Sequence, residues 1–191
     1  MTYKSPCYVI GSGPSLAGFD FDALPGGYRI GSNKSAWLAN CDALVSIDKR
    51  FWREHQEQIA AFSGDKYITH NTLQDQPDHG AKIMEHDRGD GFSKDPNVIR
   101  GSNSGFAALN LAYLLGYREI ALLGFDFQWS AGQSHFHDGY YWQNKQADRH
   151  LATWQRAFDT IDQSDVNIVN FVGPEGSRVT AFKTYPLSDL V

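Results

Sequence analysis

Two segments rich in glycine and serine are the first candidates for chemistry. Gly11-Ser12-Gly13-Pro14-Ser15 follows a β-branched run, and residues 101–105 (Gly-Ser-Asn-Ser-Gly) precede an apolar run. Glycines let backbone N–H groups approach an anion closely, and serine hydroxyls add further donors. Leu16 stands where a dinucleotide fingerprint needs its third glycine, and no Walker Gly-Lys-Ser follows. The two segments predict a phosphate site, with an ordinary turn and a plain helix cap (Asn103, Ser104, Gly105) as the alternatives.

An acidic residue between two aromatic residues is the next candidate. Asp126 lies between Phe125 and Phe127, directly after an apolar run. A carboxylate at a strand end can accept a hydrogen bond from a ribose hydroxyl or bind Mg²⁺, and it can also simply cap a turn. Phe127 is suited to stack on a nucleotide base.

Alternating histidines come third. His135 and His137 would place both rings on one face of an extended segment, which suits a general base or two metal ligands. Residues of a surface loop are the alternative. Tyr140 and Tyr141 follow closely and could donate to a departing phosphate.

Composition limits the class of protein. The 191 residues carry 17 Lys and Arg against 22 Asp and Glu, so the net charge is −5 and tight nucleic-acid binding is disfavoured. Ordinary hydrophobic content predicts one globular domain over residues 1–191. Cys7 and Cys41 are too few for a disulfide scaffold and predict buried thiols in a reducing cytoplasm. No apolar run is long enough to span a membrane.

Alternating strands and helices must position these candidates. Short β-rich runs predict strands, and apolar residues three or four apart predict helices between them. The strands are expected at 8–10, 28–30, 43–47, 66–69, 119–123 and 166–169, and the helices at 49–62, 104–115 and 151–161. This order predicts a mostly parallel sheet with helices on both faces, whose ligands bind beyond the carboxyl ends of the strands.

One long segment and one composition bias complete the pattern. Residues 71–97 are polar and show little periodicity, which predicts a long irregular loop or lid. The chain has 26 aromatic residues (Trp 5, Tyr 9, Phe 12), more than a single core usually needs. Seven of them lie between positions 125 and 142, which predicts a base-and-sugar pocket there.

The combination resembles the bacterial lipooligosaccharide sialyltransferases, which use a CMP-sugar donor. It is also similar to a broader Rossmann-like group that includes the hydroxymethylpterin diphosphokinase-like proteins. The matching residues are Gly11 to Leu16, Asn33 within Gly-Ser-Asn-Lys, Asn103 to Gly105, and the block 115–127 that ends in Gly-Phe-Asp-Phe. The resemblance implies a Rossmann-like fold.

The resemblance also implies roles for individual residues. It implies nucleotide contacts for Gly11, Ser12, Gly13, Ser15, Asn33, Asp48, Asn103, Ser104, Gly105, Asp126 and Phe127, a histidine base (His135 or His137) and support of the leaving phosphate by Tyr140 or Tyr141. The sequence departs from the family in three ways. Asp48 replaces a base-contacting Asn, Gln128 replaces a Tyr, and both histidines lie nearer Asp126 than the family histidine does.

The sequence therefore predicts a cytoplasmic glycosyltransferase-like enzyme that transfers a sugar from a nucleotide donor to a hydroxyl acceptor without a required cofactor. One alternative is Mg²⁺-dependent diphosphokinase-type transfer from ATP, with Asp126 on the metal. Another is a nucleotide-binding protein of the same fold without catalysis. A nucleic acid acceptor and a homo-oligomer with a shared site are left open.

Overall fold

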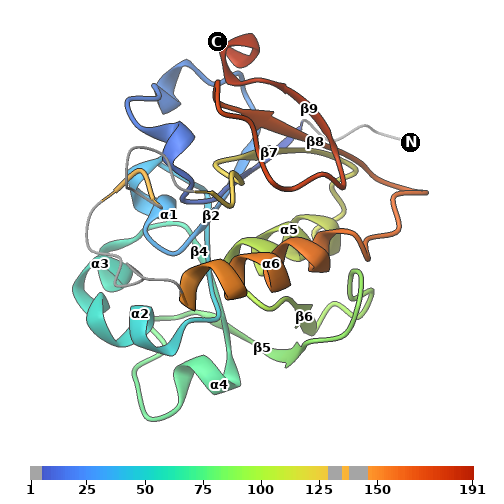
Figure 1. Cartoon of the computed structure of the whole chain (residues 1–191). Helices are drawn as coiled ribbons and strands as arrows, with labels where there is room; N and C mark the ends of the chain where they lie inside the picture. Colours follow the sequence, from blue (N-terminus) through green and yellow to red (C-terminus); the bar gives the residue numbers. More distant parts are fainter. Residues whose placement is uncertain (1–5, 129–134, 138–145) are drawn as a thin grey trace.

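A twisted, wholly parallel β-sheet forms the centre of the molecule (Figure 1). The computed structural model describes residues 6–128, 135–137 and 146–191. Within these residues the sheet has nine strands in the order β6-β5-β4-β3-β2-β1-β7-β8-β9. The strands are β1 Cys7–Ile10, β2 Tyr28–Ser32, β3 Ala43–Ser46, β4 Asp65–Thr69, β5 Lys82–Asp87, β6 Val98–Arg100, β7 Glu119–Leu123, β8 Asn167–Val172 and β9 Lys183–Pro186.

Helices connect the strands and cover both faces of the sheet. The α-helices are α1 Ser35–Leu38, α2 Lys49–Glu54, α3 Gln56–Ala61, α4 His70–Leu73, α5 Ser104–Leu114 and α6 Gln146–Phe158, with short 3-10 turns at Pro14–Leu16, Phe21–Ala23 and Leu187–Leu190. The predicted Rossmann-like α/β architecture is confirmed. The helix predicted over 49–62 is divided at His55, whose φ of −124° and ψ of 32° are not helical.

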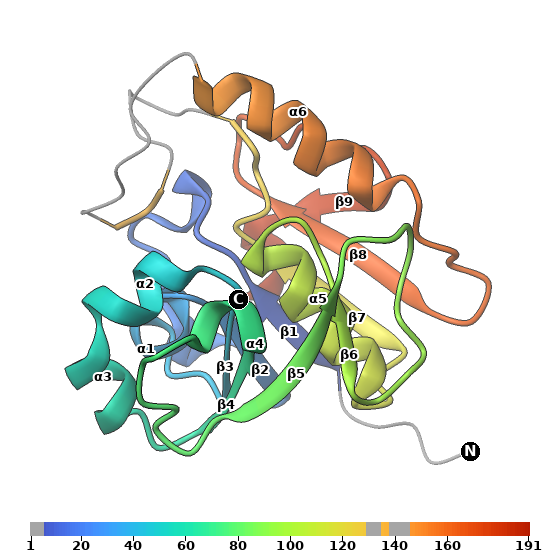
Figure 2. The ribbon, with the colours of Figure 1, turned by 90° about the horizontal axis from the view of Figure 1, so that it is seen from below.

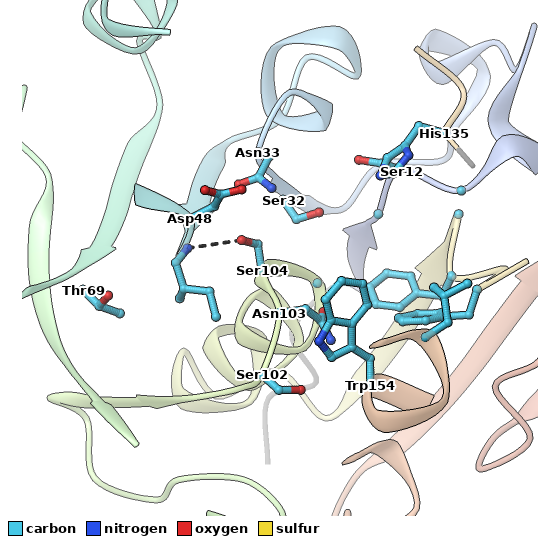
Figure 3. A pocket seen from close by; sticks show the side chains of 18 of the residues that line it. Ser12, Ser32, Asn33, Asp48, Thr69, Ser102, Asn103, Ser104, His135 and Trp154 are labelled. Atoms are coloured by element: carbon cyan, nitrogen blue, oxygen red, sulfur yellow. Dashed lines mark hydrogen bonds between the residues drawn. The ribbon is translucent and has the colours of Figure 1, made fainter. Parts of the chain in front are cut away.

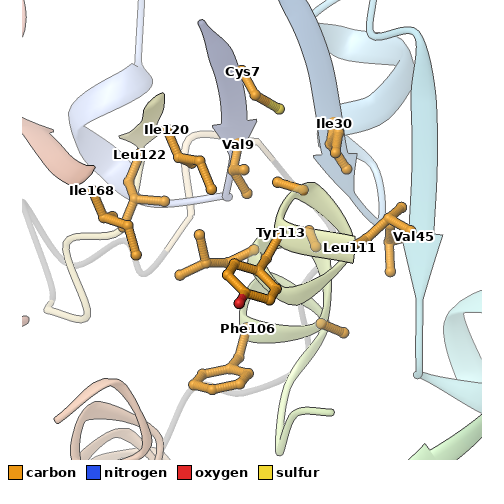
Figure 4. Packing of buried hydrophobic residues seen from close by; sticks show 14 of the residues in the cluster. Cys7, Val9, Ile30, Val45, Phe106, Leu111, Tyr113, Ile120, Leu122 and Ile168 are labelled. Carbon is orange, nitrogen blue, oxygen red and sulfur yellow. The ribbon is translucent and has the colours of Figure 1, made fainter. Parts of the chain in front are cut away.

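Successive side chains of the central strands enter two different cores. Cys7 and Val9 of β1 pack with α5 and with Phe158 of α6, whereas Tyr8 and Ile10 pack against Trp52 and the other helices of the opposite face. A strand covered on both faces has an unbroken apolar sequence. Figure 4 shows α5 lying against β1, β2 and β3, and Figure 2 shows α6 beside α5. Both cysteines are buried thiols, as predicted, and burial raises the pKa of the Cys41 thiol to about 12.

The direction in which strands are added to the sheet reverses at β1. The chain runs outward from β1 to β6 on one side, and then returns to add β7 on the other side. Cys7 therefore pairs with both Tyr28 and Ile120. Such a switch point opens a crevice between the loops that follow the two strands, and ligands of open α/β sheets bind there.

The predicted irregular loop over 71–97 is not what the structure shows. Residues 82–87 form β5, which pairs with β4 and β6. The Asn110 side chain of α5 holds the following segment, since its Oδ1 accepts from Arg100 N at 2.7 Å and its Nδ2 donates to Ser93 O at 3.2 Å. Sequence patterning misses β5 because only Met84 of its six residues is fully buried.

None of the helices in the described residues is long and apolar enough to cross a bilayer.

Candidate functional site

A cavity of about 470 Å³ lies beyond the carboxyl ends of β1 to β5 and β7 (Figure 3). It occupies the switch point and extends along the sheet edge. Its wall comes from loops that are far apart in sequence. The lining residues are Gly11, Ser12, Gly13, Ser32, Asn33, Ile47, Asp48, Lys49, Thr69, Asn71, His86, Arg88, Ser102, Asn103, Ser104, Gly105, Gly124, Phe125, Phe127, Gln128, His135, Leu151 and Trp154.

The first glycine-rich loop is fastened to β7. The N–H of Gly11 donates to Leu123 O and that of Gly13 donates to Gly124 O, both at 2.8 Å. A Cβ at Gly13 would lie 2.6 Å from Gly124 O and 2.4 Å from an Asp126 carboxylate oxygen, so no other residue fits. Gly124 itself has φ of +70°, which an L side chain rarely adopts. The loop is therefore held in one shape, with Gly11, Ser12 and Gly13 at the cavity wall.

Asp126 stabilises this loop and does not line the cavity. One carboxylate oxygen accepts from Ser15 N and the other from Ser15 Oγ, each at 2.7 Å. Asp126 is only 1% exposed. Burial raises the pKa of its carboxyl, whereas the Ser15 hydrogen bonds lower it. The predicted ribose contact and the Mg²⁺ role of Asp126 do not fit this placement, because Ser15 engages both oxygens. Ser15 is likewise turned to Asp126 and away from a ligand.

The amino end of α5 forms the opposite wall. Asn103 Oδ1 caps the helix by accepting from Phe106 N at 2.9 Å, and Ser104 Oγ accepts from Ile47 N at 3.2 Å. The Ser104 hydroxyl hydrogen therefore remains for another acceptor. The first N–H groups of a helix lack intrahelical partners, and the helix dipole favours an anion beside them. Among the described residues the buried Asn103 Nδ2 has no hydrogen-bond partner, so it adds a donor to this wall.

Asn33 and Asp48 lie side by side at the ends of β2 and β3 (Figure 3). Asn33 adopts a left-handed φ of +53°, which asparagine tolerates well, and its N–H donates to Val45 O at 3.1 Å. Asp48 caps α2, with Oδ1 accepting from Arg50 N at 2.8 Å and from Phe51 N at 3.1 Å. Both residues line the cavity.

Only one of the two candidate histidines lines the cavity. The N–H of Phe136 donates to Ser12 O at 3.0 Å, which fixes residues 135–137 above the glycine loop. His135 faces the cavity, whereas His137 packs edge-on against Phe136. Burial first, and then the nearby His137 and Lys34, lower the pKa of His135 to about 3. His135 is thus neutral at physiological pH. Tyr140 and Tyr141 lie outside the described residues.

Aromatic side chains close one end of the cavity. Phe127 has φ of +50°, a strained conformation for a bulky residue, and its carbonyl accepts from Gln155 Nε2 of α6 at 3.3 Å. Phe125, Phe127 and Trp154 line this end, and Figure 3 shows the Trp154 indole beside Asn103. Apolar spacing within residues 151–161 suggests helix packing for Trp154, whereas the structure places this residue at the cavity. The aromatic residues at 129 and 140–142 lie outside the described part.

The described residues contain no group of three or more His, Cys, Asp or Glu side chains that could hold a metal ion.

Comparisons with known proteins address the fold. No protein-family model and no curated protein matches the chain. Among solved structures, the MAf glycosyltransferase of Magnetospirillum magneticum AMB-1 matches with 16% identity and a TM-score of 0.56. That match covers all of this chain but only 35% of the other. The sialyltransferase CstII of Campylobacter jejuni, in complex with cytidine-5'-monophosphate, matches with 15% identity and a TM-score of 0.55, over 97% of this chain and 87% of that one.

The chain has a glycosyltransferase-like fold. The same sialyltransferase in complex with the substrate analogue CMP-3FNeuAc matches with a TM-score of 0.50 over 95% of this chain. At 15–16% sequence identity, these matches show a shared fold and nothing further.

Proposed function

We propose that this chain binds a nucleotide-activated sugar, with a CMP-sugar favoured, and transfers the sugar to a hydroxyl acceptor. One observation carries the proposal. The start of α5, whose first N–H groups lack intrahelical partners, faces the side-chain-poor loop Gly11–Gly13 across one cavity at the β1/β7 switch point. A helix start that a glycine loop leaves accessible suits the phosphate of a nucleotide. The likeness to a sialyltransferase solved with cytidine-5'-monophosphate supports the choice of nucleotide.

The cavity offers distinct places for the parts of a donor. The phosphate lies between Gly13 and the start of α5, where Ser104 Oγ and the Asn103 amide supply donors. The nucleoside extends toward Phe127 and Trp154, because a base stacks on aromatic faces. Asn33 lies on the sugar side of the phosphate. All these residues line the cavity.

In the proposed transfer, the bond between the anomeric carbon and the phosphate oxygen breaks, and its electron pair stays on the phosphate. The acceptor oxygen bonds to the anomeric carbon, and His135 takes the acceptor proton as general base. The N–H groups at the start of α5 stabilise the added negative charge on the phosphate. Tyr140 or Tyr141 remains a candidate for further support of that charge.

A neutral His135 can accept a proton, but a pKa of about 3 makes it a weak base in the empty cavity. A bound phosphate supplies negative charge, which favours the imidazolium form. We therefore expect nucleotide binding to raise the pKa of His135 toward about 7, which makes the ring a stronger base. Binding measured below that pH should be accompanied by proton uptake. Calorimetry of binding in buffers of different ionisation enthalpy measures that uptake.

The test combines binding and turnover. CMP, UDP, GDP, ADP and their sugars are screened by thermal shift, since a ligand that binds the folded state raises its melting temperature. Hydrolysis of the selected donor is then measured for the wild type and for His135→Gln. His70→Gln is the control, because His70 lies on α4, is exposed and does not line the cavity. Loss of turnover in His135→Gln alone supports the proposal.

Two outcomes would overturn it. Absence of binding by every nucleotide and sugar nucleotide removes the donor site. Turnover of ATP that EDTA abolishes assigns the chain to Mg²⁺-dependent diphosphoryl transfer instead, whereas we propose a transfer that requires no metal ion. Full turnover in His135→Gln would refute the role of His135 as general base but would not contradict the donor site.

A further inference from the structure

The cavity continues well past the two phosphate-binding segments. Lys49 follows β3, Asn71 follows β4, and His86 and Arg88 lie at the end of β5. The strand register brings them together. Ser46 pairs with Ile68 and Thr69 pairs with Met84, so Lys49, Asn71 and His86 follow at one level of the sheet edge. Neither the sequence patterns nor the proposed donor site assigns a role to this end of the cavity.

Two cationic side chains line this end of the cavity, against one carboxylate, that of Asp48. Among the described residues, no carboxylate lies within ion-pair distance of Lys49 or Arg88. Asp48 caps α2 through Oδ1, and Asp87, which precedes Arg88, is held by Arg100 at 2.7 Å. Lys49 Nζ donates to the neutral side chain of Gln74, which leaves its charge uncompensated. Lys49 and Arg88 thus supply two cations to the wall of one cavity.

His86 adds a positioned imidazole. Its Nε2 lies 2.8 Å from Gly101 O, and because a carbonyl only accepts, Nε2 carries a hydrogen. In the neutral ring Nδ1 then only accepts, so it suits a hydroxyl group of a ligand and not an anionic oxygen. With Thr69 and Asn71 beside it, this end offers cationic and neutral hydrogen-bonding groups, a set suited to a phosphate or carboxylate.

A nucleotide phosphate bound beside Gly13 cannot also contact Arg88. β5 is the fourth strand from β1, and at the usual spacing of strands the two lie about 19 Å apart. Even an extended arginine side chain does not span that distance. The nucleoside is assigned to the opposite end, where Phe127 and Trp154 lie. An anion at Arg88 therefore belongs to a different chemical group.

We propose that Lys49 and Arg88 form a subsite for a second anionic group, a phosphate or carboxylate carried by the acceptor or by the transferred sugar, with His86 placed to accept from a hydroxyl group of the same substrate. The part that this ligand plays in the reaction rests on the proposed function. Its negative charge is inferred from the side chains that line the cavity alone. The substrates are then a nucleotide donor at the switch point and an acid group several strands away, in one continuous cavity.

The test uses the full chain saturated with CMP and titrated with inorganic phosphate. Phosphorus NMR follows the free phosphate, whose resonance is distinct from that of CMP and broadens on binding. Arg88→Gln and Lys49→Gln are expected to weaken phosphate binding about five-fold each, with the CMP affinity changed less than two-fold. Lys82→Gln is the control. It removes a lysine from the amino end of β5, away from the cavity.

Two further ligands identify the source of the anion. If Arg88→Gln weakens binding of CMP-sialic acid but not of CMP, the anionic group belongs to the sugar. If it weakens binding of glucose 6-phosphate, and not of glucose, to the CMP-bound protein, the group belongs to the acceptor. Either result supports the subsite.

The inference is overturned if phosphate binds all four proteins equally, or if it binds only in competition with CMP. A chain that binds no nucleotide refutes the proposed function separately. The subsite is then judged by phosphate binding to the nucleotide-free wild type and to Arg88→Gln.

Discussion

Replacing His135 by glutamine is expected to change how stability depends on pH. His135 is buried above Ser12, with His137 and Lys34 nearby, and these surroundings lower its pKa from 6.5 to about 3. Glutamine keeps a polar side chain of similar size but has no ionisable group. Any difference in pH dependence between the two proteins therefore reports on the imidazole.

The size of the effect follows from linkage. The pKa of His135 is lower in the folded chain than in the unfolded chain. The neutral ring therefore contributes fully to the free energy of unfolding above about pH 6.5, and this contribution is lost as the pH falls toward about 3. Between about pH 7 and pH 5, the unfolded chain binds a proton that the folded chain refuses. At about 1.36 kcal/mol per pH unit below pH 6.5, His135 alone lowers the free energy of unfolding by about 2 kcal/mol over that interval.

Urea denaturation of both proteins near pH 7 and near pH 5 measures this difference. The wild type should lose about 2 kcal/mol more than His135→Gln does. Measurements above pH 7 serve as the internal control, because there neither state of the wild type binds the proton and the difference reports packing alone. Equal losses in the two proteins would refute the burial argument. A His135 ring that titrates in NMR at its ordinary pKa would refute it too.

Three substitutions test the remainder of the site and core by urea denaturation. Asp126→Ala should lower the free energy of unfolding by about 3 kcal/mol through loss of both Ser15 hydrogen bonds, and Asp126→Asn, which retains an acceptor, by much less. Gly13→Ala should lower the free energy of unfolding by about 2 kcal/mol or more and abolish nucleotide binding, because the added Cβ would lie 2.4 Å from the Asp126 carboxylate. The control Gly26→Ala, which has open space around it, should have neither effect. Asn170→Leu should raise the free energy of unfolding by about 1 kcal/mol, since neither polar atom of this fully buried side chain has a partner among the described residues; unchanged or lower stability would contradict this.

The central strands could be predicted because they are buried on both faces. Residues 7–10, 43–46 and 119–123 have short apolar sequences bounded by turn residues, and the structure places them side by side or one strand apart. The edge strands β6 and β9, and β5 beside β6, could not. All four residues of β9 are exposed, so no hydrophobic period marks it.

The sequence predicted which residues lie at the cavity better than it predicted what each of them does. Glycine spacing and strand ends located Gly13, Asn33 and Ser104 at the cavity. Asp126 was assigned to a ligand because local sequence does not show that Ser15, 111 residues earlier, takes both of its oxygens. Arg88 was missed because the strand before it, β5, was missed. The signal that could have found it is the apolar pair Ile83 and Met84 ahead of a charged segment, residues 85–90.

The central position of β1 has a consequence for how the chain folds during synthesis. Cys7 of β1 pairs with Ile120 of β7, so the first strand made waits for one made more than 100 residues later. Until β7 emerges from the ribosome, β1 is an apolar edge strand, open to pairing with another chain. The Gly11–Gly13 loop also lacks its Leu123 and Gly124 acceptors until then. A nascent chain that ends before residue 119 therefore carries the glycine loop without its acceptors, and the loop is fastened in the same step in which β1 gains its second neighbour.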